Sequence, residues 1–214
     1  MTLQVHAYIL AGGRSSRFGS DKARATIDGL PLILRLANAV ATFSLSITVV
    51  ARREDTYQDL GLRTIADYED FGGPVAGLLR ALDDLVEKNI QPIESVNGNS
   101  FSHPSALADP TRALVLSCDL ICWEPAWLTA LLAMSHSGSN AIAFRTDRWQ
   151  PFPGLYHPEM ANAIRARTGF EDASMQTLLD DPNCKSIGIS MNGLPSIRSA
   201  NTQDELRRWI SESK

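Results

Sequence analysis

The stretch AYILAGGRSSRFGSDK, residues 7–22, starts as an apolar run and breaks abruptly into a polar, glycine-containing loop. The apolar residues 7–11 are typical of a strand that is buried on both faces of a sheet. Gly12 and Gly13 follow directly, so the backbone there can approach a bulky ligand, and successive amides can form an anion-binding nest. This stretch therefore predicts a buried strand that ends at a binding loop.

Outward from this stretch, short apolar segments alternate with helical patterns. Further buried strands are expected at residues 47–50, 62–66, 113–117 and 141–144. Helices are expected at residues 31–43, 54–60, 74–85, from 125 onward, in two short pieces after residue 144, and at 202–211. Thr202 and Glu205 would form a capping box for the last helix. The alternation predicts an α/β three-layer sandwich with a mostly parallel, Rossmann-like sheet.

The length and composition narrow the class of protein further. A chain of 214 residues favours one domain, residues 1–214, although residues 89–112 lack periodicity and are expected to form a mobile loop or insertion. The net charge of −4 argues against nonspecific binding of nucleic acid. Because no signal peptide or membrane-length apolar run is evident and the three cysteines read as reduced thiols, we expect a cytoplasmic protein without a membrane partner.

Polar residues that follow a predicted strand are the strongest candidates for a site, because such sheets bind ligands beyond the carboxyl ends of their strands. After the first strand, Arg14, Arg17 and Lys22 supply three cations within nine residues, which suits a triphosphate. The loop fits neither the Walker nor the dinucleotide fingerprint. The alternative is a glycine turn with solvated charges.

Two carboxylates also follow predicted strands. Asp119, opposite the cationic loop, suits Mg²⁺, which takes one or two carboxylates together with phosphate oxygens and water. Its alternative role is to cap the helix that starts near Pro125. Asp67 has weaker support, because a carboxylate in this position often caps a turn. The adjacent Asp83 and Asp84 are expected on a solvated helix face.

The loop closely resembles the signature L-A-G-G-x-x-x-R-[MF]-G-x-D-K of the molybdenum cofactor guanylyltransferases, within the wider nucleotidyltransferase superfamily. Other matching segments follow in the family's order, namely residues 29–32 (G-x-P-L), Asp67 with residues 72–77 (D…G-P-[LV]-A-G), and residues 118–120 (C-D-[LM]). Two later segments also fall in the expected order, which are Gln150-Pro151 with residues 154–156, and Asn201-Thr202. The likeness covers nearly the whole chain. It departs from the family at Ala51 and Ile121, where an asparagine and a proline are common, and at Ser199, which replaces the first asparagine of N-x-N-T.

The resemblance implies a fold of the nucleotide-diphospho-sugar transferase type and a nucleotide site. Carried over by position, the residues that contact the guanine nucleotide are Leu10, Ala11, Gly12, Gly13, Lys22, Asp67 and Asp119. Asp119 would bind Mg²⁺, with Asn201 as a candidate second ligand. Lys22 and Arg17 would neutralise the leaving pyrophosphate during catalysis.

The implied reaction transfers GMP from GTP to the phosphate of molybdopterin and releases pyrophosphate. Other proteins of molybdenum cofactor biosynthesis are further candidate partners. Two alternatives stay open, which are a nucleotidyltransferase for another base or acceptor (cytidylyl or sugar-phosphate type) and a nucleotide-binding regulator without catalysis. Retention of both Lys22 and Asp119 argues against the regulator, since a pure binder does not need the metal carboxylate.

Overall fold

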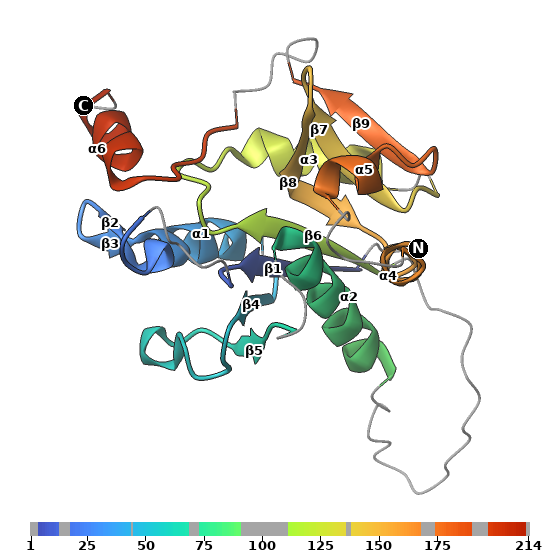
Figure 1. Ribbon diagram of the computed structural model, residues 1–214, viewed down its shortest axis with the longest axis horizontal. Coiled ribbons are helices and arrows are strands. Elements are labelled where there is room, and N and C mark those ends of the chain that lie inside the picture. Colours follow the sequence, from blue (N-terminus) through green and yellow to red (C-terminus); the bar gives the residue numbers. More distant parts are fainter. Residues whose placement is uncertain are drawn as a thin grey trace, which may run out of the picture.

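The computed structural model describes residues 4–12, 18–43, 45–68, 73–90, 111–135, 138–167, 174–189 and 197–212. In this part of the chain, seven strands form one sheet in the order β5-β4-β1-β6-β8-β7-β9 (Figure 1). Their bounds are β1 Gln4–Leu10, β4 Ile47–Ala51, β5 Thr64–Ala66, β6 Thr111–Ser117, β7 Ala141–Arg145, β8 Trp149–Tyr156 and β9 Cys184–Gly188. Within this sheet, all described strand pairs are parallel except those of β8, which runs opposite to β6 and β7. The predicted mostly parallel sheet is therefore confirmed.

Helices cover both faces of the sheet because side chains alternate along the buried strands. On β1, Tyr8 and Leu10 belong to one core cluster with residues of α2 (Pro74–Ile90), α4 (Met160–Arg165) and α5 (Met175–Leu179). Ala7 and Ile9 belong to a second cluster with residues of α1 (Leu32–Ala41) and α3 (Pro125–Ala133). The result is the predicted three-layer sandwich.

A third cluster connects the two ends of the described chain. Phe18, Ile27 and Leu32 pack with Ala200 and Leu206, the last of which lies on α6 (Gln203–Glu212). Figure 1 shows α6 beside the short hairpin formed by β2 (Thr26–Ile27) and β3 (Leu30–Pro31). This packing brings the segment that precedes α6 to the loop that follows β1.

The capping box of α6 is confirmed by its hydrogen bonds. The Glu205 amide donates to Thr202 Oγ1 at 3.1 Å, and the Thr202 amide donates to Glu205 Oε2 at 3.3 Å. The Asn201 amide also donates to Glu205 Oε2, at 2.6 Å. One glutamate side chain therefore holds both the start of the helix and the residue that precedes its cap.

Several expectations about elements need correction. Strands β8 and β9 were not expected, and residues 54–60 form turns and a short 3₁₀ helix, Gln58–Leu60, in place of the expected helix. Of the expected loop at 89–112, the first two residues continue α2 and the last two begin β6, while residues 91–110 lie outside the described residues.

The expectation for Asp83 and Asp84 was wrong. Asp84 is 2% exposed and accepts hydrogen bonds from Tyr8 Oη and from the Arg63 guanidinium, because α2 packs this face onto the sheet. Asp83 accepts hydrogen bonds from Tyr68 and from Arg165.

No helix in the described residues is long and apolar enough to cross a membrane.

Candidate functional site

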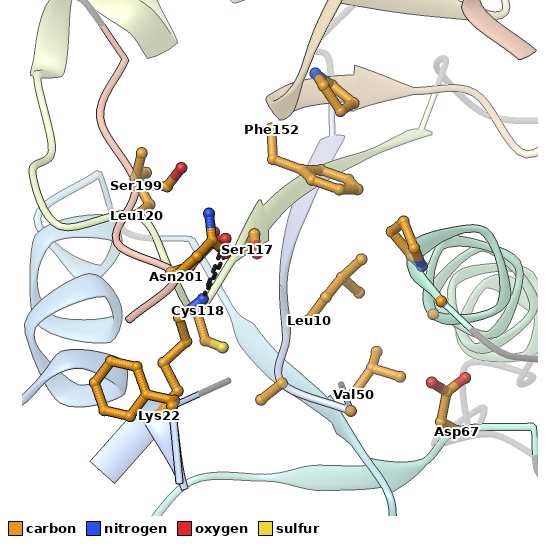
Figure 2. Close-up of a pocket in the computed structure, with 18 of the residues that line it drawn as sticks. Leu10, Lys22, Val50, Asp67, Ser117, Cys118, Leu120, Phe152, Ser199 and Asn201 are labelled. Carbon is orange, nitrogen blue, oxygen red and sulfur yellow. Dashed lines mark hydrogen bonds and ion pairs between the residues drawn. The ribbon is translucent and has the colours of Figure 1, made fainter. Parts of the chain in front are cut away.

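A cavity of about 550 Å³ opens at the carboxyl ends of β1 and β6, where the strand order reverses. This volume lies in the range of small-molecule sites. Its walls come from the ends of β1, β4, β5 and β6, the turn at Lys22, the start of α2, the first half of β8 and residues 197–201. In Figure 2, Lys22 and Asn201 lie on one side of the pocket and Asp67 on the other, with Leu10 and Val50 between them. The location agrees with the prediction from sheet topology.

On the Asp67 side, the backbone at Gly12, which follows β1, lies close to Asp67, which follows β5. A Cβ on Gly12 would lie only 2.8 Å from Asp67 Oδ2, so a side chain at position 12 would displace this carboxylate. The Ala11 amide donates to Val50 O at 2.8 Å, and the Asp67 amide donates to Ala51 O at 2.6 Å. Burial raises the pKa of Asp67, whose carboxylate accepts a hydrogen bond from the Tyr68 amide. Asp67 therefore forms a half-buried wall of the pocket next to the end of β1.

On the opposite side, a short 3₁₀ turn, Lys22–Arg24, presents a lysine to the pocket. Asp21 caps the turn by accepting a hydrogen bond from the Ala23 amide at 3.0 Å, and Tyr57 Oη donates to the same carboxylate. The Lys22 side chain is 11% exposed. Its Nζ donates to Asn201 Oδ1 at 3.0 Å and lies 3.5 Å from Asp119 Oδ2. The positive charge is thus held inside the site by fixed neighbours.

Asp119 lies in the turn after β6. The Cys118 amide donates to Leu10 O at 3.0 Å, which ties the end of β6 to the end of β1. The Ala200 amide donates to Asp119 O at 3.0 Å, which attaches the segment before α6. The N-cap of α3 is Glu124, so the alternative in which Asp119 caps that helix is wrong.

The Cys118 thiol beside Asp119 is not suited to nucleophilic chemistry. Burial, with a further contribution from the Asp119 charge, raises its pKa to about 12. At this pKa the thiol stays protonated near neutral pH. Because the thiolate is the reactive form of cysteine, Cys118 is a poor nucleophile. The polar residues offered on this side include Lys22, Asp119 and Asn201, and Asp21, Ser117 and Ser199 also line the pocket.

The oxygen atoms of Asp119 and Asn201 suit a magnesium ion. Both point at one atom, Lys22 Nζ, so two oxygen ligands converge on a point that already holds a positive charge. Mg²⁺ is commonly held by one or two protein oxygens while substrate phosphates and waters complete its octahedron. Among the described residues, no group of three or more His, Cys, Asp or Glu side chains could hold a metal.

The structure brings together Leu10, Ala11, Gly12, Lys22, Asp67 and Asp119 of the predicted site residues. Gly13 and Arg17 lie outside the described residues. Asn201 also lines the pocket, as do two groups that sequence reasoning did not select, residues 150–152 of β8 and Ile197 with Ser199. Gln150 and Pro151 do stand in a segment that resembles a later family motif, which is a signal that could have drawn attention to β8.

Comparison with known proteins agrees with this geometry. A family model described as a MobA-like NTP transferase domain matches residues 7–185, which is most of the chain. The chain belongs to this family.

Relatives and a solved structure extend the match. The chain is 35% identical to the "Probable molybdenum cofactor guanylyltransferase" of Pelotomaculum thermopropionicum over 162 residues, which cover 76% of this chain and 68% of that protein. It is 25% identical to the "Molybdenum cofactor guanylyltransferase" of Serratia proteamaculans, with 98% and 95% covered. The crystal structure of molybdopterin-guanine dinucleotide biosynthesis protein A from Archaeoglobus fulgidus superposes with a TM-score of 0.74 at 18% identity, over 97% of this chain and 98% of that one.

This MobA-like chain therefore has the nucleotidyltransferase fold that its loop motif implied. Solved nucleotidyltransferases of the nucleotide-diphospho-sugar type share the architecture. In this fold, the loop after β1 and the turn after β6 meet because the two strands are neighbours over seven paired residues. The family membership and the site geometry rest on separate observations.

Proposed function

We propose that this MobA-like transferase moves GMP from GTP to the phosphate of molybdopterin and releases pyrophosphate. The observation that carries the proposal is the convergence of Lys22, Asp119 and Asn201, from three distant parts of the chain, at the edge of the pocket. The names of relatives support the acceptor and the base, one of them matched over 98% of this chain and the other over 76%.

In the proposed reaction, an oxygen of the acceptor phosphate attacks the α-phosphorus of GTP as the bond from that phosphorus to the β-phosphate oxygen breaks. Lys22 would leave Asn201 for the phosphates and would neutralise charge on the departing pyrophosphate. A bound Mg²⁺ would supply Lewis-acid stabilisation of the phosphate oxygens, held by Asp119 and Asn201. Because the acceptor is already an anion at neutral pH, no side-chain nucleophile is required.

For the nucleotide, we propose that the base and sugar lie on the side of Asp67. The backbone of residues 10–12 and the start of α2 at Gly73 and Pro74 line this side. Guanine presents two donors at N1 and N2 and an acceptor at O6, which backbone groups can match. A site that hydrogen-bonds one base rejects others strongly, because its buried polar groups would otherwise be left unpaired.

Pyrophosphate release tests this proposal when GTP, CTP and ATP are each supplied with Mg²⁺, with and without molybdopterin. We expect release to depend on molybdopterin and to favour GTP by more than ~10²-fold in kcat/KM, the scale of hydrogen-bond discrimination between substrates. Equal use of CTP, or a preference for it, would overturn the guanylyl assignment and favour the cytidylyl alternative. Nucleotide binding without any turnover would favour the regulator.

A further inference from the structure

Strand β8 contains a bulge that points into the pocket. On its β7 side, the adjacent residues Ala143 and Phe144 pair with Gly154 and Gln150, so the three residues between these partners are unpaired. On its β6 side, the described pairing stops at Val115 with Gly154. Residues 151–153 read Pro-Phe-Pro, and proline suits a bulge because it has no amide hydrogen to donate to a neighbouring strand. Bulges of this kind redirect side chains near active sites.

The bulge is held in place by its own strand. The hydroxyl of Tyr156, a fully buried residue, donates to Pro151 O at 2.6 Å. A Cβ on Gly154 would lie 2.6 Å from the same oxygen and 2.9 Å from the Tyr156 ring, so a glycine is needed for the chain to fold back here. At the start of the strand, the Gln176 side chain hydrogen-bonds both the amide and the carbonyl of Trp149. Phe152 is therefore presented by a well-anchored segment.

Phe152 lines the pocket and is half-buried against the cluster on the α2 face of the sheet. Figure 2 shows its ring directed into the pocket, above Leu10 in this view. The strand order β5-β4-β1-β6-β8 puts β8 and Asp67, which follows β5, on opposite sides of β1. Phe152 therefore belongs to the side of the pocket away from Asp67, on the α2 face of the sheet, whereas Leu120 and Ile197 pack in the cluster on the opposite face.

We propose that the Phe152 ring is the surface on which the flat heteroaromatic ring of the acceptor stacks, with Gly154 and Tyr156 as positioning residues that set its orientation. This inference rests on the proposed function for the identity of the acceptor as a pterin. An aromatic side chain can stack on any flat π-system, so stacking contributes affinity with little selectivity. Selectivity would come from polar groups that hydrogen-bond the edge of the ring, such as the Gln150 amide, which lines the pocket.

Binding of a monophosphorylated pterin tests the inference without catalysis. The pterin's own fluorescence would be followed with Mg²⁺ and the non-hydrolysable α,β-methylene analogue of GTP present. We expect Phe152→Ala and Phe152→Leu to weaken pterin binding by about tenfold or more, the scale of one stacking contact, and Phe152→Trp to retain it. The Kd for the GTP analogue alone should stay unchanged in all three variants. Phe43→Ala is the matched control, because Phe43 is also half-buried but lies outside the pocket lining.

Positioning by the bulge has its own readout. Tyr156→Phe removes the hydroxyl that donates to Pro151 O and leaves Phe152 itself intact. We expect this variant to raise KM for molybdopterin with little change in kcat and none in KM for GTP. Thermal unfolding of each variant separates this effect from a general loss of structure.

The outcomes are distinct. Equal pterin affinity in wild type and Phe152→Ala, or no pterin binding by a wild type that binds the GTP analogue, would overturn the inference. A weakened Kd for the GTP analogue with unchanged pterin binding would assign Phe152 to the nucleobase and overturn it as well. Phe152-dependent pterin binding without pyrophosphate release from GTP would support the inference and contradict the proposed function.

Discussion

Lys22 Nζ lies within 3.0 Å of Asn201 Oδ1 and 3.5 Å of Asp119 Oδ2, so one ammonium links the loop after β1 to the turn after β6 and to the segment before α6. This contact balances the charge of Asp119 inside the pocket. In the proposed reaction, the same ammonium would turn from Asn201 to the phosphates of GTP.

Replacing Lys22 tests its role with phosphate. Lys22→Ala should lower kcat/KM for GTP by at least ~10²-fold, the scale of losing one preorganised electrostatic contact, while its Tm barely changes. Arg24→Ala is the matched control, because Arg24 lies on the same 3₁₀ turn but pairs with Asp59 outside the pocket. Normal turnover by Lys22→Ala would rule out the phosphate contact.

Replacing Asp119 tests the metal ligand. Asp119→Asn should abolish turnover at ordinary Mg²⁺ concentrations, because the amide lacks the negative charge that holds the ion. Some nucleotide affinity should remain, since Lys22 still attracts the phosphates. Glu124→Gln, at the N-cap of α3, should retain full activity. A variant of Asp119 that keeps its full rate at ordinary Mg²⁺ concentrations would contradict the role of Asp119 as a metal ligand.

The residues of the site were predictable from the sequence where they directly follow a strand. Gly12, Asp67 and Asp119 follow predicted strands, and parallel strands end at one edge of the sheet. Leu10 was implied by the family resemblance alone. Phe152 could not be selected in this way, since its position depends on a bulge and on which strands pair with β8. The contact between Lys22 and Asn201 joins residues 179 positions apart, and local sequence patterns do not predict contacts between residues so far apart in the chain.

At the scale of elements, α6 is coupled to the site through its cap. Glu205 Oε2 accepts hydrogen bonds from the amides of Asn201 and Thr202, so the same side chain holds the helix start and the backbone of a pocket residue. Glu205→Ala should lower the free energy of unfolding by ~1 kcal/mol and also lower kcat/KM. Urea unfolding and rate measurements on one sample check both effects.

The matched control for this prediction is Glu212→Ala, at the exposed end of the same helix. It should leave the rate unchanged. A Glu205 variant that loses stability but keeps full activity would show that the cap does not position Asn201.

Elements were predicted well where hydrophobic periodicity is strong and poorly where it is not. The apolar runs of β1, β4 and β6 and the spacing of leucines on α2 identified these elements to within a few residues. Strand β8 was missed because its sequence, WQPFPGLY, contains two prolines that normally argue against a strand. Strand β9, CKSIG, was missed because two of its five residues are exposed and polar.

At the scale of the whole molecule, a buried polar network lies at the opposite end of the sheet from the pocket. Lys88 Nζ donates to His6 Nε2 at 2.8 Å and pairs with Asp84 at 2.9 Å. Burial alone would raise the pKa of Asp84, but hydrogen bonds from Arg63, Lys88 and Tyr8 outweigh it and hold the pKa below its usual value. Burial, with a further contribution from Lys88, lowers the pKa of His6 from 6.5 to about 4.

These shifts predict how stability depends on pH. Between pH 6.5 and about 4, the unfolded chain binds a proton at His6 that the folded chain does not, so the free energy of unfolding should fall as the pH falls through this window. His6→Gln should flatten this dependence, as measured by urea unfolding at several pH values. Part of it should remain, because burial and Arg112 also lower the pKa of His157. An unchanged pH profile in His6→Gln would contradict this reading of the network.

We further propose that the chain acts as one nucleotidyltransferase domain. The third core cluster packs Ala200 and Leu206 against Phe18 and Ile27, so residues from both ends of the chain build the same side of the pocket. The alternation of strands and helices predicted the general architecture. The packing of α6 against the hairpin of β2 and β3 could not be predicted from local sequence patterns.

In the proposed reaction, the α-phosphate of GTP moves to the pterin phosphate, and isotope transfer follows this movement. The enzyme would be incubated with Mg²⁺, molybdopterin and GTP labelled with ³²P at either the α- or the γ-position, and the products separated. We expect the α-label in the pterin product and the γ-label in pyrophosphate. Transfer of the γ-label to the pterin, or no transfer of the α-label while GTP is bound, would show that GMP is not transferred.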